Sequence, residues 1–259
     1  MSEAASNGTN EAIRAEKLVK NFGHITALDG VSMHVARGET LGILGDNGAG
    51  KSTLLKILTG FHQPDSGQVY VDGRPVTLAS VDEARALGIE CVYQDLALVN
   101  GLSVYHNLFL NRELLWGWPV RFLDHRTMRR RAIEALAEIG IVVPSVDIEV
   151  GALSGGQRQA IAVARAVSSQ ARILLLDEPL AAMGAREAQL IIGLIERLKA
   201  RSDIAIVMIA HNYAQTLEIC DRVMLIQHGE VTFESTAAAT SPAELLEIVR
   251  REYRALRTG

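Results

Sequence analysis

The sequence has little of several features that mark specialised protein classes. It contains two cysteines, Cys91 and Cys220, whose spacing supports neither a disulfide framework nor a metal site. We expect both to be buried, reduced thiols. Aromatic residues make up only 5% of the chain, and its two tryptophans fall close together, at Trp116 and Trp118. The hydrophobic content of 48% over 259 residues nevertheless predicts a globular chain with a substantial core.

Long apolar runs and an excess of positive charge are also lacking. The longest apolar runs, 173–176 and 204–210, are far shorter than the ~20 residues of a membrane-spanning helix. No secretory signal is predicted at the N-terminus, so any membrane role is expected to come through a partner. The formal net charge of −4 gives no reason to expect nucleic acid as a partner. The basic run Arg129–Arg131 is interpreted as solvated helix surface rather than a polyanion site.

A glycine-rich loop stands out between a predicted strand, 40–44, and a predicted helix that includes 54–58. Its residues are Gly45, Asp46, Asn47, Gly48, Ala49, Gly50, Lys51, Ser52 and Thr53. Glycines let backbone N–H groups point inward, and the following helix adds the positive end of its dipole, so the loop is suited to phosphate groups. Lys51 can reach the β- and γ-phosphates, and the Ser52 hydroxyl can ligate Mg²⁺. The pattern predicts a site for a nucleoside triphosphate.

Further polar residues follow predicted buried strands. Asp177 and Glu178 end the apolar run that starts at Arg172, His211 follows the run 204–210, and Gln94 follows the strand predicted over 89–93. In doubly wound sheets the ligand lies beyond the carboxyl ends of the strands. There Asp177 can hold Mg²⁺ through water, Glu178 can reach the attacking water, and His211 can contact phosphate, although a single histidine is more often structural.

Two other segments have a functional and a plain structural interpretation. Leu153–Gln157 precedes a helix predicted over 158–167, either as an ordinary capped helix start or as a second group of N–H donors for phosphate. Phe22, predicted to lie in a turn, is either an ordinary packed aromatic or a flat face for adenine. Trp116–Pro119 interrupts the helical pattern, and we favour a loop plug over an interface.

The pattern along the chain predicts an α/β fold: a P-loop NTPase with a mixed sheet core, an N-terminal antiparallel β subdomain and an inserted α-helical subdomain. We expect a flexible lead at 1–12, then a single domain at 13–259. Its predicted parts are the core with the β subdomain (13–94 and 158–240), a helical lobe (95–157) and a C-terminal helix (241–259). Further predicted strands are 13–19, 31–36, 68–73, 222–227 and 231–234, and further predicted helices are 82–87, 104–112, 126–139 and 187–200.

The order of these motifs, from the phosphate loop through Gln94 and Leu153–Gln157 to the strand ending in Asp177–Glu178 and then His211, resembles the nucleotide-binding subunit of ABC transporters. The resemblance covers nearly the whole chain, and the pentapeptide with its spacing is highly specific. It implies ATP as ligand, Mg²⁺ as cofactor and ATP hydrolysis as activity. It also implies a head-to-tail homodimer in which each ATP lies between one subunit's phosphate loop and the other's pentapeptide.

The resemblance also implies roles for individual residues. Lys51 and Gly45–Thr53 correspond to the Walker A loop, and Ser154, Gly155, Gly156 and Gln157 belong to the segment that faces the partner's ATP. Glu178 corresponds to the general base, His211 to the switch residue on the γ-phosphate, and Gln94 to the residue that senses Mg²⁺ and the attacking water. Metal contacts are implied for Ser52, Gln94 and Asp177, and adenine stacking for Phe22, where the family usually has Tyr. Gly184 departs from the usual Asp, which bears on one contact across the dimer and on whether the two ATP sites are equivalent.

Finer motifs, 92–98 and 107–113, look like those of bacterial importers of ribose, xylose and fructose, and the single cassette is closest in layout to fructose-type systems. This likeness implies transmembrane permease partners, an indirect periplasmic sugar-binding protein, and a peripheral position on the cytoplasmic face of the cell membrane. Two other functions remain open at this point. A soluble ABC-type ATPase of translation or DNA repair would usually carry two cassettes or basic surfaces, and a P-loop kinase would leave the pentapeptide unexplained.

Overall fold

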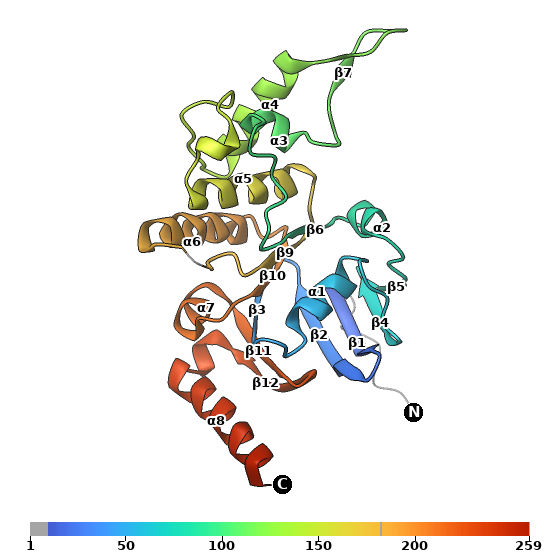
Figure 1. The fold of residues 1–259 in the computed structure, drawn as a ribbon, viewed down its shortest axis with the longest axis vertical. Coiled ribbons are helices and arrows are strands. Elements are labelled where there is room, and N and C mark those ends of the chain that lie inside the picture. Colours follow the sequence, from blue (N-terminus) through green and yellow to red (C-terminus); the bar gives the residue numbers. More distant parts are fainter. Residues whose placement is uncertain (1–9, 182, 259) are drawn as a thin grey trace.

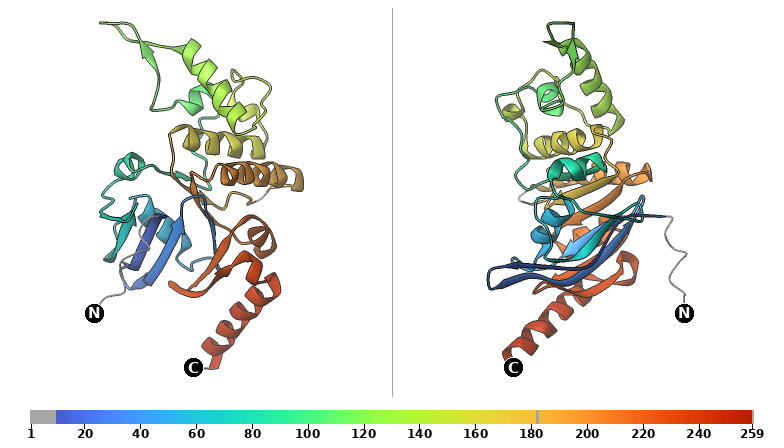
Figure 2. Two further views of the ribbon diagram at one scale, coloured as in Figure 1. Left: turned by 180° about the vertical axis from the view of Figure 1, so that it is seen from behind. Right: turned by 90° about the vertical axis from the view of Figure 1, so that its right-hand side faces the viewer.

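The computed structural model describes residues 10–181 and 183–258, so the first nine residues of the expected lead lie outside it. The protein contains two main sheets that pack against helix α1 (Lys51–Leu58), and a helical part that lies beyond one edge of the larger sheet (Figures 1 and 2). One buried cluster of apolar side chains joins the helical part to one face of the larger sheet, and a second lies between the other face, α1 and the smaller sheet. None of the helices in the described residues is long and apolar enough to cross a membrane.

The first sheet is antiparallel and has the strand order β2-β1-β4-β5. Its strands are β1 (Glu11–Phe22), β2 (Ile25–Ala36), β4 (Ser66–Val71) and β5 (Arg74–Val76). Glu11 and Ala12 already belong to β1, and Ala12 is buried, so the lead ends earlier than expected. Phe22 is the last residue of a strand rather than part of a turn, because β1 and β2 continue pairing up to Phe22 and Ile25.

The second sheet is mixed and has the order β12-β11-β3-β10-β9-β6, in which only β12 is antiparallel to its neighbour. Its strands are β3 (Thr40–Leu44), β6 (Ile89–Val92), β9 (Ile173–Asp177), β10 (Ala205–Ile209), β11 (Arg222–Gln227) and β12 (Glu230–Thr236). Strands β3 and β10 are buried along their whole length, as expected for parallel strands covered on both faces. The predicted mixed sheet with an antiparallel β subdomain is confirmed.

The helices surround these sheets and make up much of the inserted segment. They are α2 (Val81–Ala86), α3 (Val104–Leu108), α4 (His125–Glu138), α5 (Gly155–Ser168), α6 (Ala185–Ala200), α7 (Tyr213–Ile219) and α8 (Pro242–Thr258), with short 3₁₀ turns η1 (Val150–Ala152) and η2 (Ala237–Ala239). Helix α3 ends four residues earlier than predicted, and Asn111 beyond it takes a positive φ of 62°. No bounds were predicted for the short helix α7, which ends next to Cys220.

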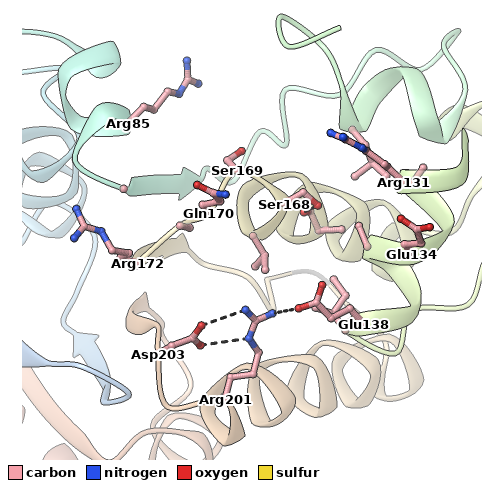
Figure 3. Close-up of a pocket in the computed structure, with 18 of the residues that line it drawn as sticks. Arg85, Arg131, Glu134, Glu138, Ser168, Ser169, Gln170, Arg172, Arg201 and Asp203 are labelled. Atoms are coloured by element: carbon pink, nitrogen blue, oxygen red, sulfur yellow. Dashed lines mark hydrogen bonds and ion pairs between the residues drawn. The ribbon is translucent and has the colours of Figure 1, made fainter. Parts of the chain in front are cut away.

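The predicted breaker at Trp116–Pro119 is part of a hairpin formed by β7 (Leu115–Trp116) and β8 (Phe122–Leu123). Trp116 and Trp118 are 61% and 88% exposed, so the interpretation as a loop plug is wrong. The arginines of the predicted basic run do point apart: Arg129 pairs with Asp147, whereas Arg131 lines a cavity on another side of α4 (Figure 3). Both cysteines are free; Cys220 is buried, but Cys91 is only half-buried.

Candidate functional site

The phosphate loop joins β3 to α1, and two of its glycines are required by close backbone contacts. Gly45 has φ 145° and Gly50 has φ 107°, in the region that other residues avoid. A Cβ at Gly45 would lie 2.2 Å from the carbonyl oxygen of Ile226, and one at Gly50 would lie 2.4 Å from that of Ala27. The loop can therefore take this course only with glycine at both positions.

Lys51, the first residue of α1, is held inside this loop. Its Nζ donates hydrogen bonds to the carbonyl oxygens of Gly45 (2.7 Å) and Asp46 (2.8 Å), and the residue is only 5% exposed. Burial lowers the pKa of Lys51, against the opposing influence of the carboxylates of Glu178, Asp46 and Asp177. The loop thus fixes the ammonium group next to the backbone that would surround a phosphate.

Strand register brings the other predicted residues to the same edge of the sheet. Ile209 of β10 pairs with Ile43 of β3 on one side and with Asp177 of β9 on the other. In β6, Val92 pairs with Leu176. Because these strands are parallel, the residues that follow them emerge together. Gly45, Glu178, His211 and Gln94 all leave the sheet at this edge.

Glu178 and His211 are in direct contact there. The Nε2 of His211 lies 2.5 Å from Oε1 of Glu178, and the backbone N–H of Glu178 donates to the carbonyl of Ile209. Glu178 has φ 51°, a conformation that costs a non-glycine residue about 1–2 kcal/mol. Such strain is found where a side chain must be held in one direction. These two residues also line a cavity of about 300 Å³.

The oxygen donors at this edge fit a magnesium ion that is shared with phosphate. Mg²⁺ is usually held by one or two protein oxygens together with phosphate oxygens and water, and needs no dedicated protein cage. The described residues contain no cluster of three His, Cys, Asp or Glu side chains that could form such a cage. Burial, then the nearby Glu178 carboxylate, raise the pKa of Asp177, and a cation would relieve both effects. Ser52 and Gln94 are exposed and carry neutral oxygens.

The second predicted phosphate segment is a regular helix start. Ser154 is the N-cap of α5, and its side chain and that of Gln157 form a reciprocal capping box. The helix therefore begins at Gly155, three residues earlier than predicted. The Gly156 N–H donates to Oε1 of Glu187 on α6 at 3.2 Å. Hydrogen bonds from Gly156 and then from the Ser154 hydroxyl lower the pKa of the Glu187 carboxyl.

Glu187 is a site residue that the sequence analysis missed. It stands three residues after Gly184, the N-cap of α6, and that spacing is the signal that could have identified a capping carboxylate. A Cβ on Gly156 would lie 2.9 Å from the Cβ of Glu187, so the two helix starts are in close contact. The turn between β11 and β12 was missed as well: Gln227 and His228 line a small hollow of about 80 Å³ with Asp46–Ala49 of the phosphate loop.

Phe22 is 43% exposed at the end of β1, so it lies outside the buried core. Its ring makes an edge-on contact with His62, with ring centroids 5.3 Å apart, and Lys20 Nζ lies 5.6 Å from the ring centroid. Ala27, five residues later in β2, is the residue whose carbonyl approaches Gly50. The β1–β2 hairpin thus leads from Phe22 to the phosphate loop.

The largest of the described cavities, about 970 Å³, lies elsewhere. Five arginines line it (Arg37, Arg85, Arg131, Arg172 and Arg201), but no phosphate-loop residue does. Figure 3 shows Arg201 between Asp203 and Glu138, to both of which it donates hydrogen bonds. The positive charge of Arg201 is thus paired with two carboxylates. Although this cavity is large, it lacks the phosphate loop and is not the candidate nucleotide site.

Comparisons with known proteins identify the family of this chain. The family model described as "ABC transporter" matches residues 28–181. The xylose/arabinose import ATP-binding protein XylG of Sulfolobus acidocaldarius is 42% identical over 89% of this chain and 90% of its own length. The fructose import ATP-binding protein FrcA of Rhizobium meliloti is 40% identical over 84% of this chain and 85% of its own. The match to the ribose import ATP-binding protein RbsA 2 of Burkholderia cenocepacia, 35% identical over 92% of this chain, covers only 46% of that protein.

Solved structures show the same fold. The ADP conformation of an ATP-binding cassette from an ABC transporter superposes with a TM-score of 0.80 at 28% identity, covering 92% of this chain and 98% of the other. A dimeric bacterial ABC transporter cassette gives a TM-score of 0.73 at 26% identity, covering 87% and 98%. The chain therefore belongs to the ABC transporter family, as an ABC ATPase related to the ATP-binding proteins of xylose, fructose and ribose importers.

Proposed function

We propose that this ATPase powers the import of a monosaccharide, as a peripheral subunit on the cytoplasmic face of the cell membrane. Its partners would be transmembrane permease subunits and, indirectly, a periplasmic sugar-binding protein. The support comes from relatives named for the import of xylose or arabinose, fructose and ribose. The single-cassette layout predicted a fructose-type system, but the xylose/arabinose relative shares this layout. The proposal therefore names the class of sugar, a monosaccharide, and no individual sugar.

In the proposed cycle two copies close head to tail around ATP. Lys51 and the phosphate loop of one copy hold the β- and γ-phosphates, while Ser154–Gly156 of the other copy face the γ-phosphate. The chain has two separate helix starts for a single nucleotide, those of α1 and α5, which is the arrangement that such a dimer requires. At the α5 start the Gly156 N–H is bonded to Glu187 of the same chain, so the γ-phosphate would have to compete with this carboxylate. Phe22 would provide the adenine contact.

The single observation that carries the catalytic assignment is the direct contact of Glu178 with His211 at the sheet edge where Lys51 is fixed. Glu178 orients a water molecule and accepts its proton as the oxygen attacks the γ-phosphorus and the bond to the ADP oxygen breaks. His211 contacts the γ-phosphate, and Lys51 stabilises the charge that develops on it. Mg²⁺, held by Ser52, Asp177 and Gln94, would supply additional charge stabilisation.

Replacing Glu178 by Gln tests this assignment. We expect ATP hydrolysis to fall by about a hundredfold or more while ATP binding persists, because the amide keeps the shape but cannot accept the proton. The variant should accumulate as an ATP-dependent dimer, measured by light scattering. Glu218→Gln, on the exposed side of α7, is the matched control and should behave as the parent. Near-parental turnover in Glu178→Gln would mean that the base lies elsewhere.

Transport itself is tested by partner capture and by sugar uptake. The protein expressed from its own host should co-purify with a hydrophobic membrane protein, and vesicles containing that complex should take up a labelled pentose or hexose in the presence of ATP. Salt-sensitive binding to RNA or DNA, with no membrane partner, would instead favour an ATPase of translation or DNA repair.

A further inference from the structure

The β7–β8 hairpin projects from the helical part at the end of the molecule opposite to α8 (Figures 1 and 2). Large apolar side chains on it are 39% to 88% exposed: Leu115, Trp116, Trp118, Val120, Phe122 and Leu123. They lie within nine consecutive residues, whereas exposed apolar residues elsewhere in the described chain are more scattered. Soluble surfaces rarely gather apolar side chains so densely unless they contact something.

Both faces of the hairpin are apolar. Trp116 pairs with Phe122 across the strands, with ring centroids 5.9 Å apart, and Leu115 pairs with Leu123. Successive residues of a strand point to opposite faces, so the aromatic pair lies on one face and the leucine pair on the other. A flat protein partner could cover only one of these faces. A medium that surrounds the hairpin would cover both.

The base of the hairpin is held in place by packing and hydrogen bonds. Leu114 packs against the core of the helical part, and its carbonyl accepts a hydrogen bond of 2.7 Å from the Asp124 N–H. Asp124 in turn caps α4 through the N–H of Thr127. The hairpin thus extends from a fixed base, and its apolar side chains lie outside the two buried clusters of the described residues.

Positive charge lies next to this apolar tip at two arginines, Arg121 and Arg126, in a chain whose formal net charge is −4. The other arginines of residues 112–131 serve elsewhere: Arg112 pairs with Glu90, for example, and Arg129 pairs with Asp147. Arg121 in the hairpin and Arg126 near its base are exposed. Arg126 acts electrostatically on the Asp124 carboxylate, whereas Arg121 has no ion-pair partner within the described residues. Aromatic and aliphatic side chains next to arginines are the combination that favours the headgroup region of an anionic bilayer.

We propose that the β7–β8 hairpin inserts into the headgroup region of an anionic lipid bilayer. Tryptophan rings would lie at the level of the headgroups, the leucine pair would enter the same layer from the other face, and Arg121 and Arg126 would contact lipid phosphates. This contact is a surface separate from the nucleotide site and does not depend on which sugar, if any, is transported.

The two tryptophans of the chain are both in this hairpin, so intrinsic tryptophan fluorescence reports on it alone. The full protein is mixed with vesicles of phosphatidylcholine, with or without phosphatidylglycerol, at low salt. We expect a blue shift of the emission and flotation with the vesicles that contain phosphatidylglycerol, and weaker binding at 0.5 M salt because the arginine contribution is screened. Absence of both effects would overturn the proposal.

Variants separate lipid from a protein partner. Leu115→Ser combined with Leu123→Ser keeps both tryptophans, and we expect about tenfold weaker vesicle binding, because the lipid would surround both faces. Arg121→Glu should weaken binding to anionic vesicles specifically. Val142→Ser, at an 84% exposed apolar residue outside the hairpin, is the matched control. ATP hydrolysis should be unchanged in all of them.

A protein partner, such as the permease, is the alternative occupant of the hairpin. The same fluorescence measurement with vesicles that also contain the permease distinguishes this protein partner from lipid. A blue shift seen only with the permease present, and insensitive to the leucine pair, would assign the hairpin to a protein interface and overturn the lipid proposal. If the unmodified protein bound vesicles but its complex took up no sugar, the proposed importer function would be contradicted and the lipid contact would not.

Discussion

The phosphate loop and the Ser154–Gln157 segment are both helix starts that we propose face phosphate, yet they are built differently. The loop has glycines at positive φ and a buried lysine that donates to its carbonyls. The second segment is a regular capped helix start, and its Gly156 N–H is already bonded to the Glu187 carboxylate of the same chain. The first is thus a specialised loop complete within one chain, whereas the second is a conventional helix terminus whose proposed phosphate role depends on a second copy.

Removing the positive charge of Lys51 from the phosphate loop should have the largest effect on ATP hydrolysis. In Lys51→Ala we expect ATP hydrolysis to fall by about a hundredfold or more, because no other described cation donates to the loop carbonyls. Steady-state phosphate release and nucleotide titration measure it. Lys56→Ala, on the same helix, should retain most of the activity. If Lys51→Ala hydrolysed ATP at the parental rate, the loop would not be the catalytic cradle.

The backbones of the two helix starts also differ, and this difference predicts unequal losses of stability when a glycine in each is replaced by alanine. Gly45→Ala should lower the unfolding free energy by about 2–4 kcal/mol, because its Cβ would meet the Ile226 carbonyl at 2.2 Å and φ is 145°. In Gly155→Ala the nearest atom is 3.6 Å away and the residue is helical, so we expect a change within about 0.5 kcal/mol. Urea unfolding of the two variants compares them directly. Equal losses would show that the loop geometry described here is not required.

The smallest effect concerns Glu187, which links the starts of α5 and α6. Its carboxyl pKa is lowered from the ordinary 4.5, chiefly by the Gly156 N–H and then by the Ser154 hydroxyl. Its stabilising contribution is therefore present above pH 4.5 and is lost as the pH falls through the lowered folded-state pKa. Glu187→Gln should reduce Tm by about 1–3 °C at pH 7.

Scanning calorimetry at several pH values follows this difference, which should shrink toward acid pH. Nucleotide affinity of the monomer should be unaffected, because the phosphate loop lies at another helix. A Tm difference that stays constant down to pH 3.5 would mean that the charge of Glu187 is irrelevant to the contact.

Local patterns predicted much of the fold, since apolar runs such as Ile173–Leu176 and turn glycines specify strands and their ends without reference to distant residues. The loop plug predicted around Trp116 was wrong because burial depends on distant residues. Its apolar side chains suggested burial, but no core residues surround them, and only the tertiary structure shows that they point outward. The start of α5 was misplaced although its signal is local, because the capping box of Ser154 and Gln157 begins the helix at Gly155. Helix α3 ends earlier than its apolar spacing predicted, at Leu108.

The sequence by itself determined the cradle, because the glycines, Lys51 and Ser52 are contiguous and their geometry follows from one loop and one helix. It also determined which acids and which histidine end the buried strands. Only the tertiary structure decided that Glu178 touches His211 and that Glu187 reaches Gly156. Those contacts join residues 33 and 31 positions apart, and they depend on parallel strand register and helix packing, which no local pattern encodes.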